Sequence, residues 1–425
     1  MDGFRYSHGE LYCEDAPATS LAARYGTPLY VYSRSALTQR LKDLRQAFRS
    51  ARPLICYSVK ANSNSSLLHL LVQANAGFDI VSGGELFRIL KAGGAPSKIV
   101  FAGVGKTPDE IATALRAGIY MFNVESEAEL STVDAVAARL GRKAKVALRL
   151  NPNVDARTHT KTSTGLKEHK FGIDLPMAHD LFADRAHYSH LEIAGVHVHL
   201  GSPLYSVAPI RHALLKVRRF IRNVRELGAR PRTLNIGGGF CISYDGRKII
   251  QPADYAAVIL PIAKELGLQL IIEPGRFIVG NSAILLSRVI YVKEGWAGRK
   301  FVIIDAAMND LIRPALYGAY HHIWPVCGPV APLLGAPGRG VAKTGIETMD
   351  IVGPICETSD CFARHRRLPP VKSGDLLAIF GAGAYGMAMS STYNSRPRAA
   401  EVLVNGGKMQ RIRKRESYRD LIRGE

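Results

Sequence analysis

The chain has 425 residues, of which 47% are hydrophobic, so it is long enough to bury a large core and is expected to form two domains. No window approaches the roughly 18 uninterrupted apolar residues of a membrane span, and the N-terminus lacks the apolar core of a signal peptide. Its six cysteines are scattered and form no CxxC pair, which argues against a zinc ribbon or a disulfide scaffold. We therefore expect a reduced, cytoplasmic protein with no membrane partner.

The net charge of +20 raises the question of nucleic-acid binding. The basic residues are spread along the chain, and their local density rises only at 211–232 and 408–423. The first stretch follows a helical pattern and is expected to be its solvated face, and the second is expected to be an exposed strand or tail. Because few aromatic residues interleave with these runs, we expect non-specific attraction to polyanions and no specific nucleic-acid partner.

Strand and helix patterns alternate through the first two thirds of the chain. Residues 10–13 are predicted as a strand and 17–25 as a helix, with proline tolerated in its first turn. Short apolar, β-branched runs then alternate with helical patterns from 54 to 275. They predict strands at 54–59, 78–82, 99–103, 121–125, 145–150, 193–199, 233–237 and 269–273. This repetition predicts a (β/α)8 barrel; the rival doubly wound sheet usually has fewer strands and needs a topological switch point.

The pattern changes after residue 277. Short β-type runs, broken by Gly and Pro, lie at 277–293, 301–305, 348–353 and 375–380. They predict an antiparallel β domain, within which 331–340 is a loop. We assign 30–277 to the barrel, and 1–29 together with 278–425 to a sandwich or Greek-key-like domain. The long polar connection 152–173, after the fifth strand, is expected to be a functional loop.

Chemically capable groups gather at the ends of the predicted barrel strands. In chain order they are Lys60, Asp79, Asn123, Arg149, His197, His199, the glycines 237–239 and Glu273. Barrel enzymes build their active sites at the carboxyl ends of the strands, often with a phosphate site after strands 7 and 8. The sequence therefore predicts an active site at this rim.

Three of these groups indicate particular chemistry. Lys60 ends an apolar strand, where burial would free its amine to form a Schiff base; the alternative is a surface lysine. The glycine run after a strand exposes backbone N–H groups that can cradle a phosphate, although glycine runs also make ordinary turns. Glu273 needs a cationic partner, either a protonated pyridine nitrogen or a salt bridge to Arg276 or Arg149.

His197 and His199 alternate on a predicted strand and are therefore expected to point the same way. Two histidines so placed can hold a metal, as in some metal-dependent hydrolases. Such a centre needs further ligands, and Asp79 is the only clear candidate. A histidine stacked on a flat aromatic cofactor fits better, so no metal is expected.

Several separated motifs together resemble the signatures of barrel-type (fold-type III) pyridoxal-phosphate-dependent decarboxylases. They are 57–62 (Tyr-Ser-Val-Lys-Ala-Asn), 199–202 (His-Leu-Gly-Ser), 237–240 (Gly-Gly-Gly-Phe), 273–276 (Glu-Pro-Gly-Arg), 356–360 (Cys-Glu-Thr-Ser-Asp) and 383–386 (Gly-Ala-Tyr-Gly). The segments 309–317 and 393–398 resemble the members that convert meso-2,6-diaminopimelate to L-lysine and CO2, the last step of lysine biosynthesis. The resemblance runs from about residue 4 to 405 and implies a lyase with pyridoxal phosphate as its cofactor.

The resemblance also implies roles for individual residues. Lys60 would hold the cofactor as a Schiff base, His199 would stack on its ring and Glu273 would pair with the ring nitrogen. The remaining cofactor-binding residues would be Asp79, Ser202, Gly237, Gly238, Gly239, Gly275, Arg276 and Tyr385.

The same resemblance implies the substrate-binding residues. Arg276, Arg313 and Tyr317 would hold the substrate carboxylate, Tyr385 would also bind the substrate, and Glu357 would bind the distal ammonium. Cys356 would be the proton donor. In the family the segment with Cys356 and Glu357 reaches the pocket of the neighbouring subunit, which implies a homodimer with shared active sites.

Diaminopimelate carries an amino acid group at each end, so its far end needs both a cation and an anion. Arg313 and Glu357 supply the two signs, unless Arg313 forms a structural ion pair with Asp305 or Asp310. Related decarboxylases of ornithine, arginine or carboxynorspermidine remain the alternative. A racemase of this fold would place arginine near the pyridine nitrogen, and a non-catalytic regulator would not need Lys60.

The sequence departs from the family pattern at three places. Pro203 follows the His-x-Gly-Ser motif where glutamine is frequent, and Thr358-Ser359 follows Cys-Glu where Ser-Gly is more usual. The loop 331–343 is longer than typical. These differences concern the loops that shape substrate specificity and leave the cofactor motifs intact.

Overall fold

The computed structural model describes residues 3–156, 165, 168, 170–328 and 345–425. The predicted loop 331–343 lies outside the described residues, as does most of 157–169 within the predicted loop 152–173. The chain forms two compact units. One consists of Met1–Arg40, Ile242–Lys248 and Arg276–Glu425, and the other of Leu41–Cys241 and Ile249–Gly275.

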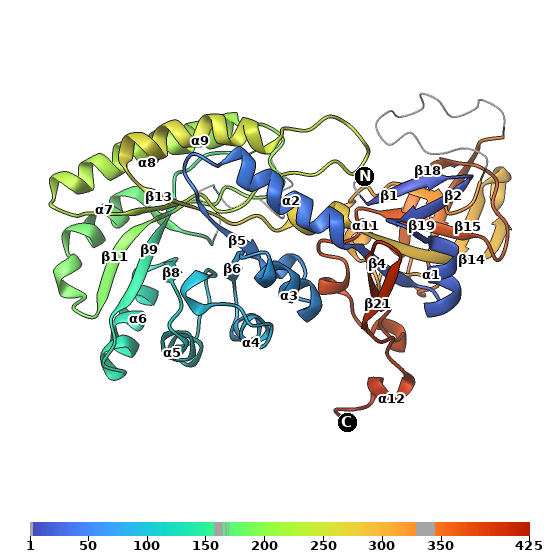
Figure 1. Ribbon diagram of the computed structural model, residues 1–425, viewed down its shortest axis with the longest axis horizontal. Helices are drawn as coiled ribbons and strands as arrows, with labels where there is room; N and C mark the ends of the chain where they lie inside the picture. The colour runs from blue at the N-terminus through green and yellow to red at the C-terminus, as the bar shows by residue number, and fades with distance from the viewer. Residues whose placement is uncertain (1–2, 157–164, 166–167, 169, 329–344) are drawn as a thin grey trace. The chain divides into compact units, whose positions relative to one another are not determined.

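The second unit is a closed parallel barrel (Figure 1). Its strands are β5 (Leu54–Ser58), β6 (Gly77–Ile80), β7 (Ile99–Phe101), β8 (Met121–Val124), β9 (Ala144–Asn151), β11 (Leu191–His197), β12 (Thr233–Asn235) and β13 (Gln269–Ile272). Each strand pairs in parallel with the next around the ring, and β13 pairs with β5 to close it. The short β10 (Ile173–Asp174) is added beside β9. The predicted barrel is confirmed, and each predicted strand lies within a few residues of an observed one.

Helices separate these strands, and most begin at a capping residue just after a strand end. They are α3 (Ser65–Gln73), α4 (Gly83–Lys91), α5 (Pro108–Ala117), α6 (Glu127–Arg139), α7 (Leu175–Ala183), α8 (Ala208–Glu226) and α9 (Pro252–Leu266). The side chains of Asn64, Ser82, Thr107 and Ser126 accept from backbone N–H groups in the first turns of α3 to α6. These caps fix the turns in which the rim residues lie.

Apolar side chains fill the interior of the barrel. Cys56, Val100, Met121, Ala147 and Ile271, from five different strands, are buried in one cluster. The barrel is therefore a packed core and not a pore, and its chemistry is confined to the rim.

The first unit is built mainly from antiparallel strands. A small sheet joins β1 (Phe4–Ser7), β2 (Glu10–Cys13) and β3 (Ala16–Pro17), and α1 (Ala18–Tyr25) follows. The larger sheet contains β4 (Leu29–Ser33), β14 (Ala283–Glu294), β15 (Lys300–Ile304), β16 (Ile323–Pro325), β17 (Glu347–Val352), β18 (Cys361–Leu368), β19 (Leu376–Phe380), β20 (Ala400–Asn405) and β21 (Lys408–Arg413). Two of its pairings, β15 with β17 and β20 with β4, are parallel. The expected β domain that also includes the N-terminal segment is confirmed.

One predicted strand boundary in this unit was wrong. Residues 276–279 form a short helix, α10 (Arg276–Val279), and the strand begins only at Ala283. The hydroxyl of Ser282 donates to the carbonyl of Val279 and closes the turn between them. A short apolar run does not distinguish a buried helical turn from a strand, which explains the error. The helix α2 (Arg34–Ala47), which precedes the barrel, was not predicted.

A buried carboxylate ties the N-terminal segment to the larger sheet. Glu14 accepts hydrogen bonds from the hydroxyl of Ser33 (2.7 Å), the backbone and hydroxyl of Ser35 (2.8 and 2.9 Å) and the backbone of Gly406 (2.6 Å). Burial by itself would raise the pKa of Glu14, but these hydrogen bonds outweigh it and lower the pKa below 4.5. The carboxylate therefore stabilises the fold above the unfolded-state pKa, and this contribution is lost as the pH falls through the folded-state pKa.

We expect Glu14→Gln to lower the free energy of unfolding by about 2 kcal/mol at pH 7, because an amide accepts these hydrogen bonds less strongly than a carboxylate. The penalty should shrink at pH 4, because this lies below the unfolded-state pKa of about 4.5 and protonation of the unfolded chain reduces the contribution of the charge. Urea unfolding at the two pH values measures it, with the exposed Glu294→Gln as the control. An equal penalty at both pH values would contradict the assigned charge.

Within the described residues, no helix is both long and apolar enough to cross a bilayer.

Candidate active site

Lys60 lies in a short helical turn directly after β5. Its ammonium nitrogen is 3.4 Å from Oδ2 of Asp79, on the neighbouring strand β6, and this oxygen also accepts from the hydroxyl of Ser58 (2.8 Å). The side chain of Asp79 is fully buried, whereas that of Lys60 is 40% exposed. The expected burial of the lysine was wrong, because the strand is buried but its terminal lysine projects beyond it. The amine is held by a carboxylate and not by an apolar pocket.

Glu273 follows β13 and is only 4% exposed. Its Oε1 accepts from the amides of Asn123 (3.0 Å) and Asn235 (2.6 Å), and its Oε2 is 3.4 Å from Nε2 of His197. Burial alone would raise the pKa of Glu273, but His197 and the hydrogen bond from Asn235 lower it, so the carboxylate is ionised at neutral pH. Burial and the nearby Glu273 raise the pKa of Asp79, although the charge of Lys60 acts to lower it. The pKa values of these two rim carboxyl groups are thus shifted in opposite directions, as in active sites where two carboxyl groups have different roles.

The considered salt bridge from Arg149 to Glu273 is not formed. Arg149, on β9, donates instead to Oε1 of Glu125 at 2.5 Å, and its guanidinium lies 4.8 Å from the ring centre of Phe171. The other oxygen of Glu125 accepts from the backbone of Gly172 at 2.9 Å. The charge of Arg149 is therefore compensated inside the barrel.

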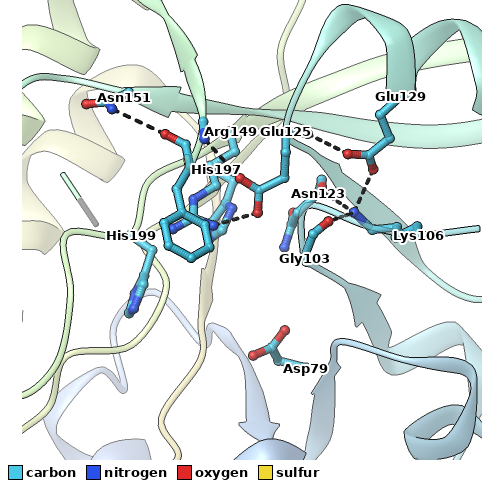
Figure 2. A network of polar contacts seen from close by, with 12 residues as sticks. Asp79, Gly103, Lys106, Asn123, Glu125, Glu129, Arg149, Asn151, His197 and His199 are labelled. Carbon is cyan, nitrogen blue, oxygen red and sulfur yellow. Dashed lines mark hydrogen bonds and ion pairs between the residues drawn. The ribbon is translucent and has the colours of Figure 1, made fainter. Parts of the chain in front are cut away.

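Figure 2 shows that this pair belongs to a larger polar network at the rim. The ammonium of Lys106 is buried and donates to the carbonyls of Gly103 (2.7 Å) and Asn123 (2.8 Å) and to Glu129 (2.6 Å). Glu129 in turn accepts from the backbone of Glu125 at 3.0 Å. This network holds the end of β8, and with it the amide of Asn123 that binds Glu273. Lys106, Glu125 and Glu129 were not predicted from the sequence as site residues, although Glu125 is the last residue of the predicted strand 121–125.

His199 does not share a strand face with His197, contrary to the prediction, because β11 ends at His197. The backbone N–H of Gly238 donates to Nδ1 of His199 at 3.1 Å, which places the ring proton of a neutral His199 on Nε2. Burial lowers the pKa of His199 well below its usual value, and the nearby Arg149 and Lys60 lower it further. His199 is therefore a neutral ring at physiological pH.

The glycine run 237–239 lies against this histidine. Gly237 has φ +64°, and a Cβ on it would come within 2.6 Å of Nδ1 of His199. The N–H groups of Gly237 and Gly238 donate to Asn235 (2.9 Å) and His199, so both are engaged inside the barrel. The N–H of Gly239, in contrast, has no protein acceptor within the described part of the chain. The absence of Cβ atoms lets the run pack closely against His199, the backbone of Glu273 and Leu204.

Other predicted cofactor residues lie beside these. Ser202 is half-buried in the segment between β11 and α8. Gly275 packs against β5, since a Cβ on it would lie 3.0 Å from Cβ of Ser58. No group of three or more His, Cys, Asp or Glu side chains arranged to hold a metal occurs among the residues that the structure describes.

The other unit contains a cluster of two arginines around one tyrosine. Arg276 donates from Nη1 to the hydroxyl of Tyr244 at 2.6 Å, and its guanidinium lies 5.1 Å from the ring centre of Tyr385. Arg313, only 6% exposed, lies with its guanidinium 4.7 Å from the ring centre of Tyr244 and its Nη1 2.8 Å from Nε2 of His321. Neither Tyr244 nor His321 was singled out from the sequence.

Tyr317 and Tyr385 frame this arginine cluster. Tyr317 is four residues after Arg313 in α11 (Arg313–Tyr317), so the two side chains share a face of that helix. Tyr385 has φ +57°, an uncommon conformation for a residue other than glycine. Backbone strain of this kind is concentrated at functional sites.

The considered ion pairs of Arg313 with Asp305 and Asp310 are not formed. Asp305 accepts from the hydroxyls of Thr27 and Ser287, and Asp310 accepts from the backbone of Ala307. Across the described ranges of the chain, Arg313 makes no ion pair with any carboxylate. A buried guanidinium without a carboxylate is costly unless an anion completes the site.

The segment 356–360 is held by the predicted motif at 393–398. The hydroxyl of Tyr393 donates to Oε2 of Glu357 at 2.9 Å, and Ser359 donates to Oε1 of the same carboxylate. These two hydrogen bonds lower the pKa of Glu357. The backbone of Cys356 donates to the side chain of Asn394 at 3.3 Å, and both Cys356 and Glu357 are exposed in the single chain.

Comparisons with known proteins agree with this architecture. A family model described as "Pyridoxal-dependent decarboxylase, pyridoxal binding domain" matches residues 34–280. A diaminopimelate decarboxylase of Pseudomonas aeruginosa is 46% identical over 425 residues, which cover 100% of this chain and 99% of that protein. One from Aquifex aeolicus is 45% identical over 414 residues, 97% of this chain and 95% of that protein.

Solved structures give the same result. The crystal structure of diaminopimelate decarboxylase from Helicobacter pylori complexed with L-lysine has a TM-score of 0.88 and 42% identity, covering 96% of this chain and 98% of that one. The resemblance inferred from the motifs is thereby confirmed. The chain belongs to the family of pyridoxal-dependent decarboxylases, and the relatives that it matches along nearly their whole length are diaminopimelate decarboxylases.

Proposed function

We propose that the chain decarboxylates meso-2,6-diaminopimelate to L-lysine and CO2 with pyridoxal phosphate as its cofactor. The observation that carries the choice of substrate is the buried guanidinium of Arg313, which has no carboxylate partner among the described residues. A substrate that kept a carboxylate at its far end would complete this site. Ornithine and arginine carry only a cationic group there, so the arginine cluster favours diaminopimelate over them.

The barrel rim fits the cofactor on several grounds. Lys60 offers an amine beside Asp79, and Glu273 offers an ionised carboxylate. Its Oε2 makes only the 3.4 Å contact with His197 among the residues that the structure describes. The buried Oδ1 atoms of Asp79 and Asn123 have no hydrogen-bond partner within the described residues. The N–H of Gly239, for which the described residues offer no acceptor, can bind a phosphate.

Individual residues of the chain would have separate roles in the reaction. Pyridoxal phosphate, when bound, supplies the electron sink for the electron pair that CO2 leaves behind. Lys60 would hold the cofactor, and Glu273 would place a negative charge beside the ring nitrogen. His199 would cover one face of the ring and, because it is neutral, would add no positive charge there. Cys356 would return a proton from Sγ to the carbon that lost CO2, and positioned proton transfer typically contributes roughly 10²–10⁴-fold.

Substrate recognition would rest on residues of opposite charge. Arg276, Arg313, Tyr317 and Tyr385 would bind the retained carboxylate, and Glu357 would bind the distal ammonium. The lowered pKa of Glu357, caused by the hydrogen bonds from Ser359 and Tyr393, supports its role as an anion. Ser202, the glycines 237–239, Gly275 and Arg276 would hold the phosphate.

We further infer a homodimer in which the segment 356–360 serves the neighbouring subunit. The exposure of Cys356 and Glu357 in the single chain supports this inference, because a proton donor and a substrate ligand need a covered site. Sedimentation at working concentration tests it, and an active monomer would contradict it.

All six cysteines are free thiols, which supports a reducing, cytoplasmic location. Cell fractionation tests this location, and recovery of the protein with an oxidising compartment would contradict it.

The direct test of the function is CO2 release by the purified protein with pyridoxal phosphate. Meso-diaminopimelate, L-ornithine and L-arginine are offered in parallel, and the amine products are identified. We expect release from diaminopimelate alone, with lysine formed in equal amount. Release only from ornithine or arginine would overturn the roles of Arg313 and Glu357 and leave those of Lys60 and Glu273 intact.

A further inference from the structure

His321 is fully buried, and both of its ring nitrogens are engaged. Nδ1 lies 2.8 Å from the carbonyl oxygen of Phe380, and Nε2 lies 2.8 Å from Nη1 of Arg313. A carbonyl only accepts and a guanidinium only donates. Nδ1 must therefore carry the proton and Nε2 the lone pair, which fixes one neutral tautomer.

The surroundings of His321 preserve this neutral state. Burial lowers the pKa of His321 to about 3, and the neighbouring Arg313, Arg276 and Arg366 act in the same direction against the hydrogen bond to Phe380. The ring centres of Tyr244 and His321 lie 5.4 Å apart in an edge-to-face arrangement, and Arg366 donates to the backbone carbonyl of His321 at 2.9 Å. A second proton on this imidazole would place a cation among three guanidinium groups.

A neutral acceptor has a different effect on an arginine from a carboxylate. Arg149 shows the contrast within the same chain, because its partner Glu125 compensates its charge. The imidazole of His321 occupies a single Nη of Arg313 and leaves its positive charge uncompensated. The geometry therefore orients Arg313 without reducing its attraction for an anion.

We propose that His321 is a positioning residue of the substrate-carboxylate site, which holds Arg313 in its binding orientation through a neutral hydrogen bond. This inference rests on the proposed function, in which Arg313 binds the carboxylate that the product L-lysine retains. It assigns to His321 a role in specificity and not in bond cleavage.

The test compares two inhibitors that differ only by this carboxylate, L-lysine and cadaverine. Inhibition constants against decarboxylation are measured for the wild type, His321→Gln, His321→Leu and His321→Glu. Leucine removes the acceptor and glutamate compensates the charge, so both should weaken L-lysine about 10-fold or more and cadaverine less than about twofold. Glutamine retains an acceptor oxygen and should stay within about threefold of the wild type for both inhibitors.

The outcomes separate the possible roles. Equal weakening of L-lysine and cadaverine would show that His321 is merely structural, and unchanged L-lysine inhibition in both His321→Leu and His321→Glu would also overturn the proposal. Cadaverine inhibition reports whether each variant retains a folded site, so a variant that fails to fold is recognised and the other decides.

If the wild type decarboxylates another amino acid, the proposed function fails by itself. If it does not prefer L-lysine to cadaverine, the carboxylate site and the role of His321 fail together.

Discussion

Lys60→Ala is expected to lower decarboxylation by roughly 10³-fold or more and, in the same protein, to remove the visible absorbance that pyridoxal phosphate acquires when bound to an amine. Lys60 offers its amine at the end of β5, beside Asp79 and partly exposed. The other lysine of the described rim network, Lys106, cannot replace it, because its ammonium already donates to Gly103, Asn123 and Glu129. Titration of the variant with cofactor, followed by absorbance and CO2 release, measures both effects.

The matched control is Lys91→Ala, which removes an exposed lysine from the end of helix α4. It should leave the absorbance and the rate unchanged. If Lys60→Ala retains the absorbance, a different amine holds the cofactor, and the assignment of Lys60 is wrong. Loss of activity with unchanged absorbance would contradict the assignment in the same way.

The same variant also tests the proposed shared active site. In the proposed homodimer, a mixture of Lys60→Ala and Cys356→Ala subunits would form some dimers in which one site contains both native residues. If the segment 356–360 serves the neighbouring subunit, mixing two nearly inactive proteins should restore part of the activity. No recovery after demonstrated subunit exchange would contradict the shared site.

Much of the barrel was predictable, because buried parallel strands appear as short continuous apolar runs. All eight runs correspond to strands, and the rim residues Lys60, Asp79 and Glu273 lie at their carboxyl ends as expected. The prediction failed where the apolar run was too short to define a period. The predicted strand at 277–293 therefore included part of what is a helical turn, residues 276–279. The predicted strand at 193–199 included His199, which lies beyond the end of β11.

The supporting residues of the site could not be predicted from the sequence. Tyr244 lies in a loop between two barrel segments of the chain, and His321 directly precedes another histidine, so neither has a periodic pattern or a motif. Their roles depend on contacts with Arg276 and Arg313, which come from other segments of the chain. The same holds for Lys106, whose acceptors come from three different segments. Such networks are visible only when the fold has brought the groups together.

Glu273→Gln is expected to lower kcat by roughly 10²–10³-fold, with a smaller change in KM, because it removes a preorganised charge without removing a substrate contact. The Oε1 position lies between the amide groups of Asn123 and Asn235, both donors, so the glutamine oxygen must occupy it. Its NH2 group then occupies the Oε2 position beside His197. The variant keeps the shape of the site and presents a donor where the wild type presents a negative charge.

The pH dependence of Glu273→Gln separates a loss of charge from a loss of structure. Because the pKa of Glu273 is lowered, the wild-type carboxylate is ionised throughout the neutral range, and the ratio of the two kcat values should be constant from pH 6 to pH 8. Asp79→Asn is the matched control, since it alters the other buried carboxyl of the rim, whose pKa is raised. It should cost less in kcat at pH 6 than at pH 8, because a pKa of about 6 leaves the Asp79 carboxyl half protonated at pH 6. A Glu273→Gln enzyme that retained more than a tenth of the wild-type kcat would show that decarboxylation does not depend on a negative charge at this position.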